Sequence, residues 1–201
     1  MAPRDGRCKV NMKDISLIGF MGCGKSSVGK ILATLLPECR LIDLDTYIEE
    51  KQGKNIPEIF NEYGEAAFRR MEREALEEIF SDKSRPRAIL SLGGGTVTSE
   101  QCRQLIRQHT DCFYLRATTD TLLDNLEGHS DGRPMLNPTQ PVEAQSTETS
   151  SEREALRHRI ESLMQTRSPQ YLATANHIID IDGLSFAQIA EAVEANILNI
   201  K

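Results

Sequence analysis

Short runs of apolar, β-branched residues alternate along this chain with longer stretches in which apolar positions recur every three or four residues. The short runs predict strands and the longer stretches predict helices. The predicted strands are 15–20, 41–44, 88–92, 112–115 and 177–181, and the predicted helices are 25–36, 56–80, 99–109, 118–127, 152–166 and 185–199. Strands that alternate with helices favour an α/β fold, a three-layer αβα sandwich with a five-stranded parallel sheet, because right-handed crossovers place helices on both faces.

One long segment has neither pattern. Residues 137–151 (NPTQPVEAQSTETSS) are rich in Pro, Ser, Thr and Glu and almost free of large apolar residues. Such a segment cannot bury itself, so we expect it to belong to a mobile lid spanning about 129–151. The total of 201 residues fits a single domain with room for this lid.

Composition excludes several classes of protein. With 39% hydrophobic and 27% charged residues, the chain is typical of a soluble globular protein. The net charge of −6 argues against a nonspecific nucleic-acid partner. No apolar run approaches the length of a membrane span, and residues 1–13 lack the apolar core of a signal peptide. Five scattered cysteines without a CxxC pair indicate neither a disulfide framework nor a zinc site, so we expect a cytoplasmic protein.

The clearest motif is a phosphate-binding loop. Residues 19–26 (GFMGCGKS) match GxxxxGK[ST], and they follow a predicted strand and open a predicted helix. In such a loop the backbone N–H groups and the helix N-terminus surround a phosphate, the lysine reaches the β- and γ-phosphates, and the serine hydroxyl meets Mg²⁺. The expected nucleotide-binding residues are Gly22, Cys23, Gly24, Lys25, Ser26 and Ser27. A simple glycine-rich turn is the alternative, and Cys23 is either a small residue that fits or a thiol activated by positive potential.

Two carboxylates follow the second predicted strand. Asp43 and Asp45 are two residues apart, so at a strand end they would point to the same side, toward the carboxyl edge where such sheets bind ligands. One could support Mg²⁺ while the other meets a hydroxyl to be phosphorylated. The alternative is that an aspartate before a helix only caps it.

Two later motifs contain further candidate residues, an arginine with a glutamate and a run of glycines. Residues 59–76 place Phe68, Arg69 and Glu72 within one helical turn, where a solvated ion pair is the alternative reading. A buried strand then runs into Gly93, Gly94 and Gly95, as close approach of a ligand to the main chain would require.

Taken together, these motifs resemble the shikimate kinase family. GFMGCGKSSVGK, the DxD of LIDLD, the GExxFRxxE of GEAAFRRME, LGGGTV, RPML and RSPQY occur in that family's order with similar spacing, over roughly residues 14–200. The resemblance implies a fold of the P-loop NTPase type, with residues 1–13 as a tail and 14–201 as one kinase domain. It implies Mg²⁺-dependent transfer of the ATP γ-phosphate to the 3-hydroxyl of shikimate, in aromatic amino-acid biosynthesis. The partners would be small molecules only, with no nucleic acid or membrane, and the protein a monomer.

The resemblance also implies a role for each matching position. Lys25, Asp45 and Arg133 would be catalytic, with Asp45 holding and deprotonating the hydroxyl and Arg133 meeting the γ-phosphate and nucleotide. Ser26 would bind Mg²⁺, and Asp43 would act on it through water. The shikimate-binding residues would be Asp45, Phe60, Phe68, Arg69, Glu72, Gly93, Gly94, Gly95 and Arg167, with Arg69 and Arg167 holding the carboxylate and Glu72 orienting Arg69. The chain departs from the family where an adenine-facing arginine is common, since residues 125–127 read Asn-Leu-Glu.

Two other functions stay open on the residues. A kinase of the same architecture acting on gluconate or a nucleotide would keep Lys25, Ser26 and Asp45 without needing both arginines and the three glycines. A nucleotide-binding switch or a silent relative would signal by binding alone. A GTPase switch should show an NKxD motif, which is absent from the sequence, and a silent relative should have lost Asp45, Arg69 or Arg133.

Overall fold

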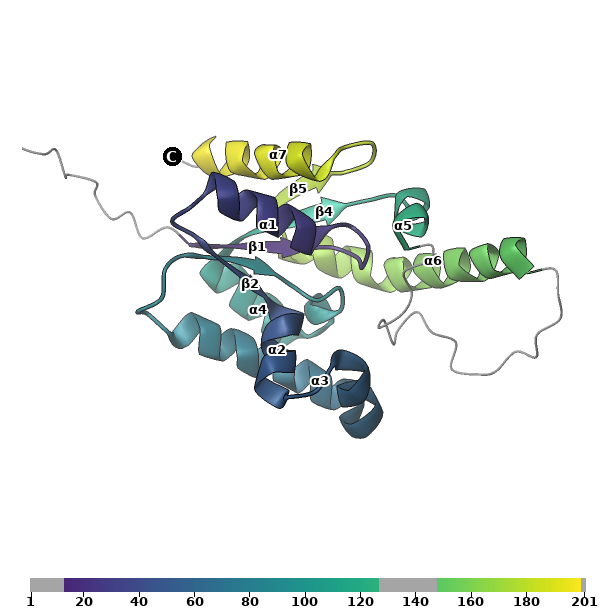
Figure 1. The fold of residues 1–201 in the computed structure, drawn as a ribbon, viewed down its shortest axis with the longest axis horizontal. Helices are drawn as coiled ribbons and strands as arrows, with labels where there is room; N and C mark the ends of the chain where they lie inside the picture. Colours follow the sequence, from purple (N-terminus) through teal and green to yellow (C-terminus); the bar gives the residue numbers. More distant parts are fainter. Residues whose placement is uncertain (1–12, 127–147, 200–201) are drawn as a thin grey trace, which may run out of the picture.

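In the computed structural model, residues 13–126 and 148–199 are described, so most of the expected tail and lid, with Arg133, lies outside the described chain. Five parallel strands form one sheet in the order β2-β3-β1-β4-β5 (Figure 1), which confirms the predicted fold class. The strands are β1 (Asp14–Ile18), β2 (Arg40–Asp43), β3 (Ala88–Ser91), β4 (Thr110–Arg116) and β5 (His177–Asp180). Each prediction lies within a few residues of its strand.

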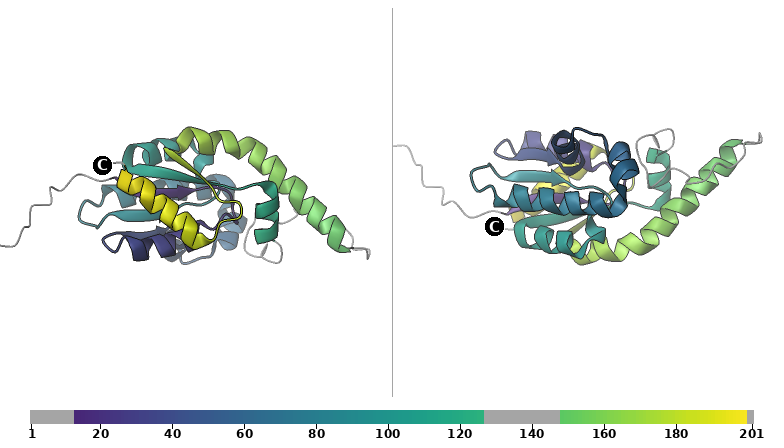
Figure 2. Two further views of the ribbon diagram at one scale, coloured as in Figure 1. Left: turned by 90° about the horizontal axis from the view of Figure 1, so that it is seen from above. Right: turned by 90° about the horizontal axis from the view of Figure 1, so that it is seen from below.

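Helices cover both faces of the sheet. They are α1 (Lys25–Leu35), α2 (Leu44–Gln52), α3 (Ile56–Ser81), α4 (Glu100–His109), α5 (Thr119–Leu126), α6 (Glu148–Thr174) and α7 (Phe186–Asn199), with a 3-10 turn, η1 (Thr96–Thr98). Figures 1 and 2 show α1 and α7 side by side on one face and α3 and α4 on the other. None of the described helices is long and apolar enough to cross a membrane.

Alternating side chains of the strands feed two apolar clusters. Ile15 and Leu17 point to the cluster beneath α1 and α7, whereas Ile18 joins the cluster beneath α3 and α4. Between them Ser16 is buried, and its hydroxyl shares a 2.7 Å hydrogen bond with that of Thr110. A buried polar pair satisfied in this way costs little and links two central strands.

Helix α2 was not expected from the apolar pattern, and it changes the geometry of the acidic pair. Asp43 ends β2 and is the N-cap of α2, where its Oδ1 accepts hydrogen bonds from the backbone N–H groups of Asp45 (3.2 Å) and Thr46 (3.4 Å). Asp45 lies in the first turn of the helix. Strand alternation therefore does not extend to Asp45, and Asp43 does cap a helix, but both carboxylates line the same cavity at the carboxyl edge, as expected.

Helix α6 also differs from the prediction, because it runs past residue 166 to Thr174 with Pro169 inside it. A proline removes one helical hydrogen bond and usually ends a helix. Here Arg167, Tyr171 and Thr174 on the two sides of Pro169 are all buried, so packing against the body holds the helix in place. The other end of α6 projects away from the sheet (Figures 1 and 2).

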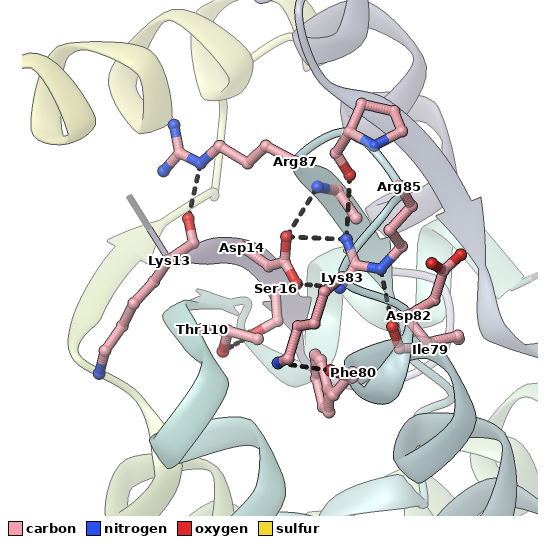
Figure 3. Close-up of polar contacts among 12 residues, drawn as sticks. Lys13, Asp14, Ser16, Ile79, Phe80, Asp82, Lys83, Arg85, Arg87 and Thr110 are labelled. Atoms are coloured by element: carbon pink, nitrogen blue, oxygen red, sulfur yellow. Dashed lines mark hydrogen bonds and ion pairs between the residues drawn. The ribbon is translucent and has the colours of Figure 1, made fainter. Parts of the chain in front are cut away.

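Basic residues gather at the amino edge of the sheet, although the chain is acidic overall (Figure 3). Lys83 Nζ donates to the Phe80 carbonyl at 2.9 Å and Arg85 Nε donates to the Ile79 carbonyl at 2.7 Å, both in the last turn of α3. Lys13 Nζ donates to the Arg107 carbonyl of α4 at 3.2 Å. Carbonyls at a helix C-terminus lack partners within the helix and carry partial negative charge. These cations therefore cap two helices, while Arg85 also pairs with Asp14.

Helix α3 bends at Gly64, whose φ of 76° and ψ of 170° are not helical. The sequence predicted one continuous helix there. Because only glycine adopts this backbone conformation readily, the bend depends on Gly64, and it sets the direction of the segment that carries Arg69 and Glu72.

Replacing Gly64 with Ala should lower the free energy of unfolding by about 1–3 kcal/mol, measured by urea denaturation. A Cβ at Gly64 would meet no described atom within 4 Å, so the loss reports backbone strain alone. Gly53→Asn is the matched control, because Gly53 has a left-handed φ of 64° that asparagine tolerates. A Gly64→Ala protein as stable as the wild type would contradict the strain.

Candidate functional site

A cavity of about 400 Å³ opens at the carboxyl edge of the sheet, where sheets of this kind bind ligands. Three segments far apart in sequence meet there: the phosphate-binding loop, the start of α2 and the loop after β3. The lining residues are Met21, Gly22, Gly24, Lys25, Ser26, Ser27, Asp43, Asp45, Ser91, Leu92, Gly93, Gly94, Asn125 and Phe186. Nine of the predicted site residues, from Gly22 to Gly94, are among them.

The phosphate-binding loop joins β1 to α1, as the motif predicted. Lys25 is the first residue of α1 and is buried. Its Nζ donates to the carbonyls of Gly19 (2.9 Å) and Phe20 (3.0 Å), so the ammonium group is folded onto the loop itself.

Cys23 lies in the loop but does not line the cavity. Its side chain is fully buried in the apolar cluster beneath α1 and α7, with Sγ 3.7 Å from Lys25 Nζ. This burial favours the reading of a small residue that fits, rather than that of an exposed, reactive thiol.

Ser26 connects the loop to the acidic pair. Its hydroxyl donates to Asp43 Oδ2 at 2.6 Å and lies 3.2 Å from the hydroxyl of Ser91. Sequence reasoning did not assign Ser91 to the site. A single hydroxyl at the end of the fully buried strand β3, two residues before the first of the three glycines, was the available signal.

Asp45 is the carboxylate with a perturbed proton affinity. Burial raises its pKa to about 7, the carboxylates of Glu72 and Asp43 act in the same direction, and Lys25 opposes them. A carboxyl group with this pKa is close to half ionised at neutral pH, as suits a group that accepts and returns a proton. Asp45 lies in the first turn of α2, a helix that the sequence did not predict, and it lines the same cavity as Lys25.

Glu72 is fully buried, with 0% of its surface exposed. Its Oε2 accepts a 2.7 Å hydrogen bond from Arg69 Nη1, and its Oε1 accepts one from the Thr96 hydroxyl. Arg69 also pairs with Glu65 at 2.9 Å. The reading of a solvated ion pair on a helix face is therefore wrong for Glu72, while its expected contact with Arg69 is present. Thr96 was not assigned from sequence.

The three glycines after β3 make room for these charged side chains. A Cβ at Gly93 would lie 2.9 Å from Asp45 Oδ1 and 3.0 Å from Glu72 Oε1. A Cβ at Gly95 would lie 2.3 Å from Arg69 Nη2. Close approach does require glycine here, but the groups that approach are side chains of the protein as well as any ligand.

Arg167 lies on α6 and is not part of the cavity lining. It is 3% exposed, its Cζ lies 5.9 Å from the centre of the Phe20 ring, and its Nη1 has no hydrogen-bond partner in the described part of the chain. A buried guanidinium nitrogen without an acceptor is costly, so this position favours an anionic ligand.

Two aromatic rings stand beside the arginine of α3. Phe60 and Phe68 have ring centroids 4.8 Å apart, and the Arg69 Cζ lies 5.6 Å from the centre of the Phe68 ring. Glu72 and Arg69 thus lie against the glycines, with the two rings beside Arg69. The cavity lining itself does not include Phe60, Phe68, Arg69, Glu72, Gly95 and Arg167.

Asn125 and Phe186 line the cavity on the phosphate-loop side. Asn125 Nδ2 donates to the Gly22 carbonyl at 3.0 Å. Phe186 is 43% exposed, and a Cβ at Gly24 would lie 2.5 Å from its ring. No pattern in the sequence marked Phe186, because only the packing of α7 against α1 brings it to the loop.

Comparison with known proteins agrees with this geometry. The family model described as "Shikimate kinase" matches residues 21–197. The shikimate kinase of Chlorobaculum tepidum is 37% identical over 187 residues, 91% of each chain, and that of a Sulfurihydrogenibium species is 36% identical over 182 residues, 90% of this chain and 96% of its own.

Solved structures give the same result. The shikimate kinase of Acinetobacter baumannii in complex with shikimate superposes with a TM-score of 0.78 and 29% identity, covering 94% of this chain and 95% of its own. A tunicamycin resistance protein of Deinococcus radiodurans, at 17% identity and a TM-score of 0.58, shares the fold. Because the family model covers most of the sequence and relatives exceed 30% identity over about nine-tenths of it, the chain belongs to the shikimate kinase family.

Proposed function

We propose that this protein is an ATP-dependent kinase that transfers the γ-phosphate of ATP to the 3-hydroxyl of shikimate, giving shikimate 3-phosphate and ADP. One observation carries the proposal. The loop with Lys25 and Ser26 shares a cavity with Asp45, a carboxyl group of raised pKa, and with the glycines that lie against Glu72 and its partner Arg69. A phosphate donor and an acidic acceptor would meet there.

The nucleotide phosphates would lie against the loop of Gly22, Cys23, Gly24, Lys25, Ser26 and Ser27. Lys25 would exchange the carbonyls of Gly19 and Phe20 for the β- and γ-phosphates, because a phosphate is the stronger acceptor for an ammonium group. Asn125 and Phe186 would flank the base. An exposed aromatic ring beside the loop offers a surface on which a base can stack.

The residues present fit Mg²⁺. The Ser26 hydroxyl and the Asp43 carboxylate, 2.6 Å apart at the cavity wall, offer the oxygen donors that this ion prefers. Among the described residues no group of three or more His, Cys, Asp and Glu side chains could hold a metal by itself, which agrees with an ion carried largely by water and phosphate. We propose that Ser26 binds Mg²⁺ directly and Asp43 through water. When bound, Mg²⁺ would neutralise charge on the phosphates.

On the acceptor side, Asp45 would take the proton of the attacking hydroxyl as the new O–P bond forms and the bond to ADP breaks. Arg69, oriented by Glu72, and the unpartnered Nη1 of Arg167 would bind the carboxylate of the acid. Backbone N–H groups of Gly93, Gly94 and Gly95 would contact the same acid, with Phe60 and Phe68 as its apolar wall. Arg133 would stabilise charge on the transferring phosphoryl group.

We also propose that residues 14–201 form a single kinase domain with a lid at about 129–151, acting as a monomer in the cytoplasm. The four cysteines in the described ranges are free and buried, as suits a reducing compartment.

The reaction itself is tested by coupled ADP release with Mg-ATP and four conditions: shikimate, gluconate, nucleoside monophosphates and no acceptor. We expect release with shikimate alone, because the two arginines match a carboxylate next to hydroxyl groups. Release with another acceptor would keep phosphoryl transfer and overturn the substrate. No release in any condition, with ATP still bound, would indicate a binding protein.

The two classes of arginine should separate in steady-state kinetics. Arg133→Ala should lower kcat by roughly 100-fold or more with little change in KM for shikimate, because it acts on the transferring phosphate. Arg69→Ala should first raise KM for shikimate, by about 10-fold or more.

Since Arg69→Ala also leaves Glu72 as an uncompensated buried charge, its fold requires a control. Arg69→Lys keeps the charge without the paired hydrogen bonds and should still raise this KM. Equal losses of shikimate affinity in the Arg133 and Arg69 variants would contradict the division of roles.

The pH dependence follows from Asp45. Because its pKa is raised to about 7, the carboxyl is protonated below that pH and cannot accept a proton. The value of kcat/KM should fall as the pH drops through about 7, with the slope of a single proton, and Asp45→Asn should abolish turnover. A profile that is flat from about pH 6 to 8 in the wild type would contradict a catalytic Asp45 of this pKa.

A further inference from the structure

The two arginines proposed to bind the carboxylate, Arg69 and Arg167, each have a neighbour on the same helix that is hydrogen-bonded to one loop, residues 93–96. On α3, Glu72 follows Arg69 by three residues and is bonded to the Thr96 hydroxyl. On α6, Tyr171 follows Arg167 by four residues, and its hydroxyl donates to the Gly94 carbonyl. Residues three or four apart share a helix face, so each tie holds the face that presents the arginine.

Tyr171 is held in a single position by its surroundings. Its side chain is completely buried, and its ring stacks on Tyr114 with centroids 5.0 Å apart and an interplanar angle of 23°. Burial raises the pKa of its hydroxyl, while Arg167 acts against this by charge and by a hydrogen bond. The hydroxyl therefore stays protonated and donates to the Gly94 carbonyl, with the charge of the Arg167 guanidinium beside it.

Gly94, which accepts the hydrogen bond from Tyr171, lies at the proposed reaction site. Gly94 lines the cavity, and a Cβ at Gly94 would lie only 3.1 Å from the backbone nitrogen of Met21 in the phosphate-binding loop. A shift of Gly94 therefore moves the wall shared by the two substrates.

On α6, Tyr171 lies close to an interruption in the helical hydrogen bonds. Pro169 stands between Arg167 and Tyr171 and cannot donate a helical hydrogen bond. The position of Arg167 therefore depends more than usual on contacts outside the helix. Tyr171, four residues further along, supplies such a contact for the helix by donating to the Gly94 carbonyl, whereas Nη1 of Arg167 has no acceptor in the described chain.

We propose that Tyr171 is a positioning residue, whose hydroxyl fixes Arg167 against the glycine loop and so sets the geometry in which the carboxylate of the acid is bound. The proposal rests on the proposed function, because it concerns the same acid. Tyr171 does not itself contact the reacting atoms.

The test is Tyr171→Phe, which removes a single oxygen and keeps the stacked ring. We expect KM for shikimate to rise about 10-fold, the effect of one hydrogen bond to a charged group, with KM for ATP and kcat within about twofold of the wild type. Tyr114→Phe is the matched control, since it removes the hydroxyl of the stacked partner, whose hydrogen bond goes to Ser168. It should leave KM for shikimate unchanged.

Three outcomes would overturn the proposal: equal effects in the Tyr171 and Tyr114 variants, no change in KM for shikimate, or a parallel rise in both KM values, which indicates a general loss of structure. Urea denaturation of each variant shows that it is folded under the assay conditions. If the wild-type protein does not phosphorylate shikimate, the proposed function is wrong. The failure of that proposal is therefore distinguishable from the failure of the role of Tyr171.

A double-mutant cycle tests the route through Arg167. Arg167→Lys should itself raise KM for shikimate, and adding Tyr171→Phe should then change it by less than about twofold, because the group that Tyr171 positions has already been altered. Effects that multiply in the double variant would show that the two residues act independently, and would overturn positioning through Arg167.

Discussion

The compensation of the buried carboxylate of Glu72 is the interaction on which the arrangement of Arg69 and the glycine loop depends. A fully buried charge is tolerated only with compensating partners. Here Arg69 supplies the opposite charge and Thr96 a second hydrogen bond. These groups approach the main chain after β3 closely, and glycine at residues 93 and 95 leaves room for them. One buried charge therefore accounts for part of a helix face, a glycine loop and the direction of an arginine.

The same charge acts on the chemistry. Glu72 and Asp43 flank Asp45, and together with burial they raise its pKa to about 7. Lys25 opposes them, so the proton affinity of Asp45 depends on where the lysine points. In the structure Lys25 contacts two carbonyls of its own loop. A nucleotide that drew the ammonium group away would change the field at Asp45, which couples the donor and acceptor halves of the proposed site.

The two edges of the sheet differ in what they carry, a cavity at the carboxyl edge and helix caps at the amino edge. At the carboxyl edge, loops that follow the strands gather the phosphate-binding loop, the acidic pair and the glycines around one cavity. At the amino edge the helices end. Lys83 and Arg85 cap the last carbonyls of α3 (Figure 3), and Lys13 binds a carbonyl at the end of α4. Basic residues at this edge bind helix carbonyls, whereas at the other edge Lys25 binds loop carbonyls and Arg69 binds the buried carboxylate of Glu72.

The sequence by itself determined the α/β class, all five strands, the phosphate-binding loop and most of the cavity wall. Local rules suffice for these, because strand runs and glycine loops are encoded by neighbouring residues. Only the tertiary structure decided that Asp43 caps a helix, that α6 continues through Pro169 and that Phe186 reaches the loop. It also decided the partners of Thr96 and Tyr171 and the pKa of Asp45. Each of these depends on burial or on a contact between residues distant in sequence, which local periodicity does not record.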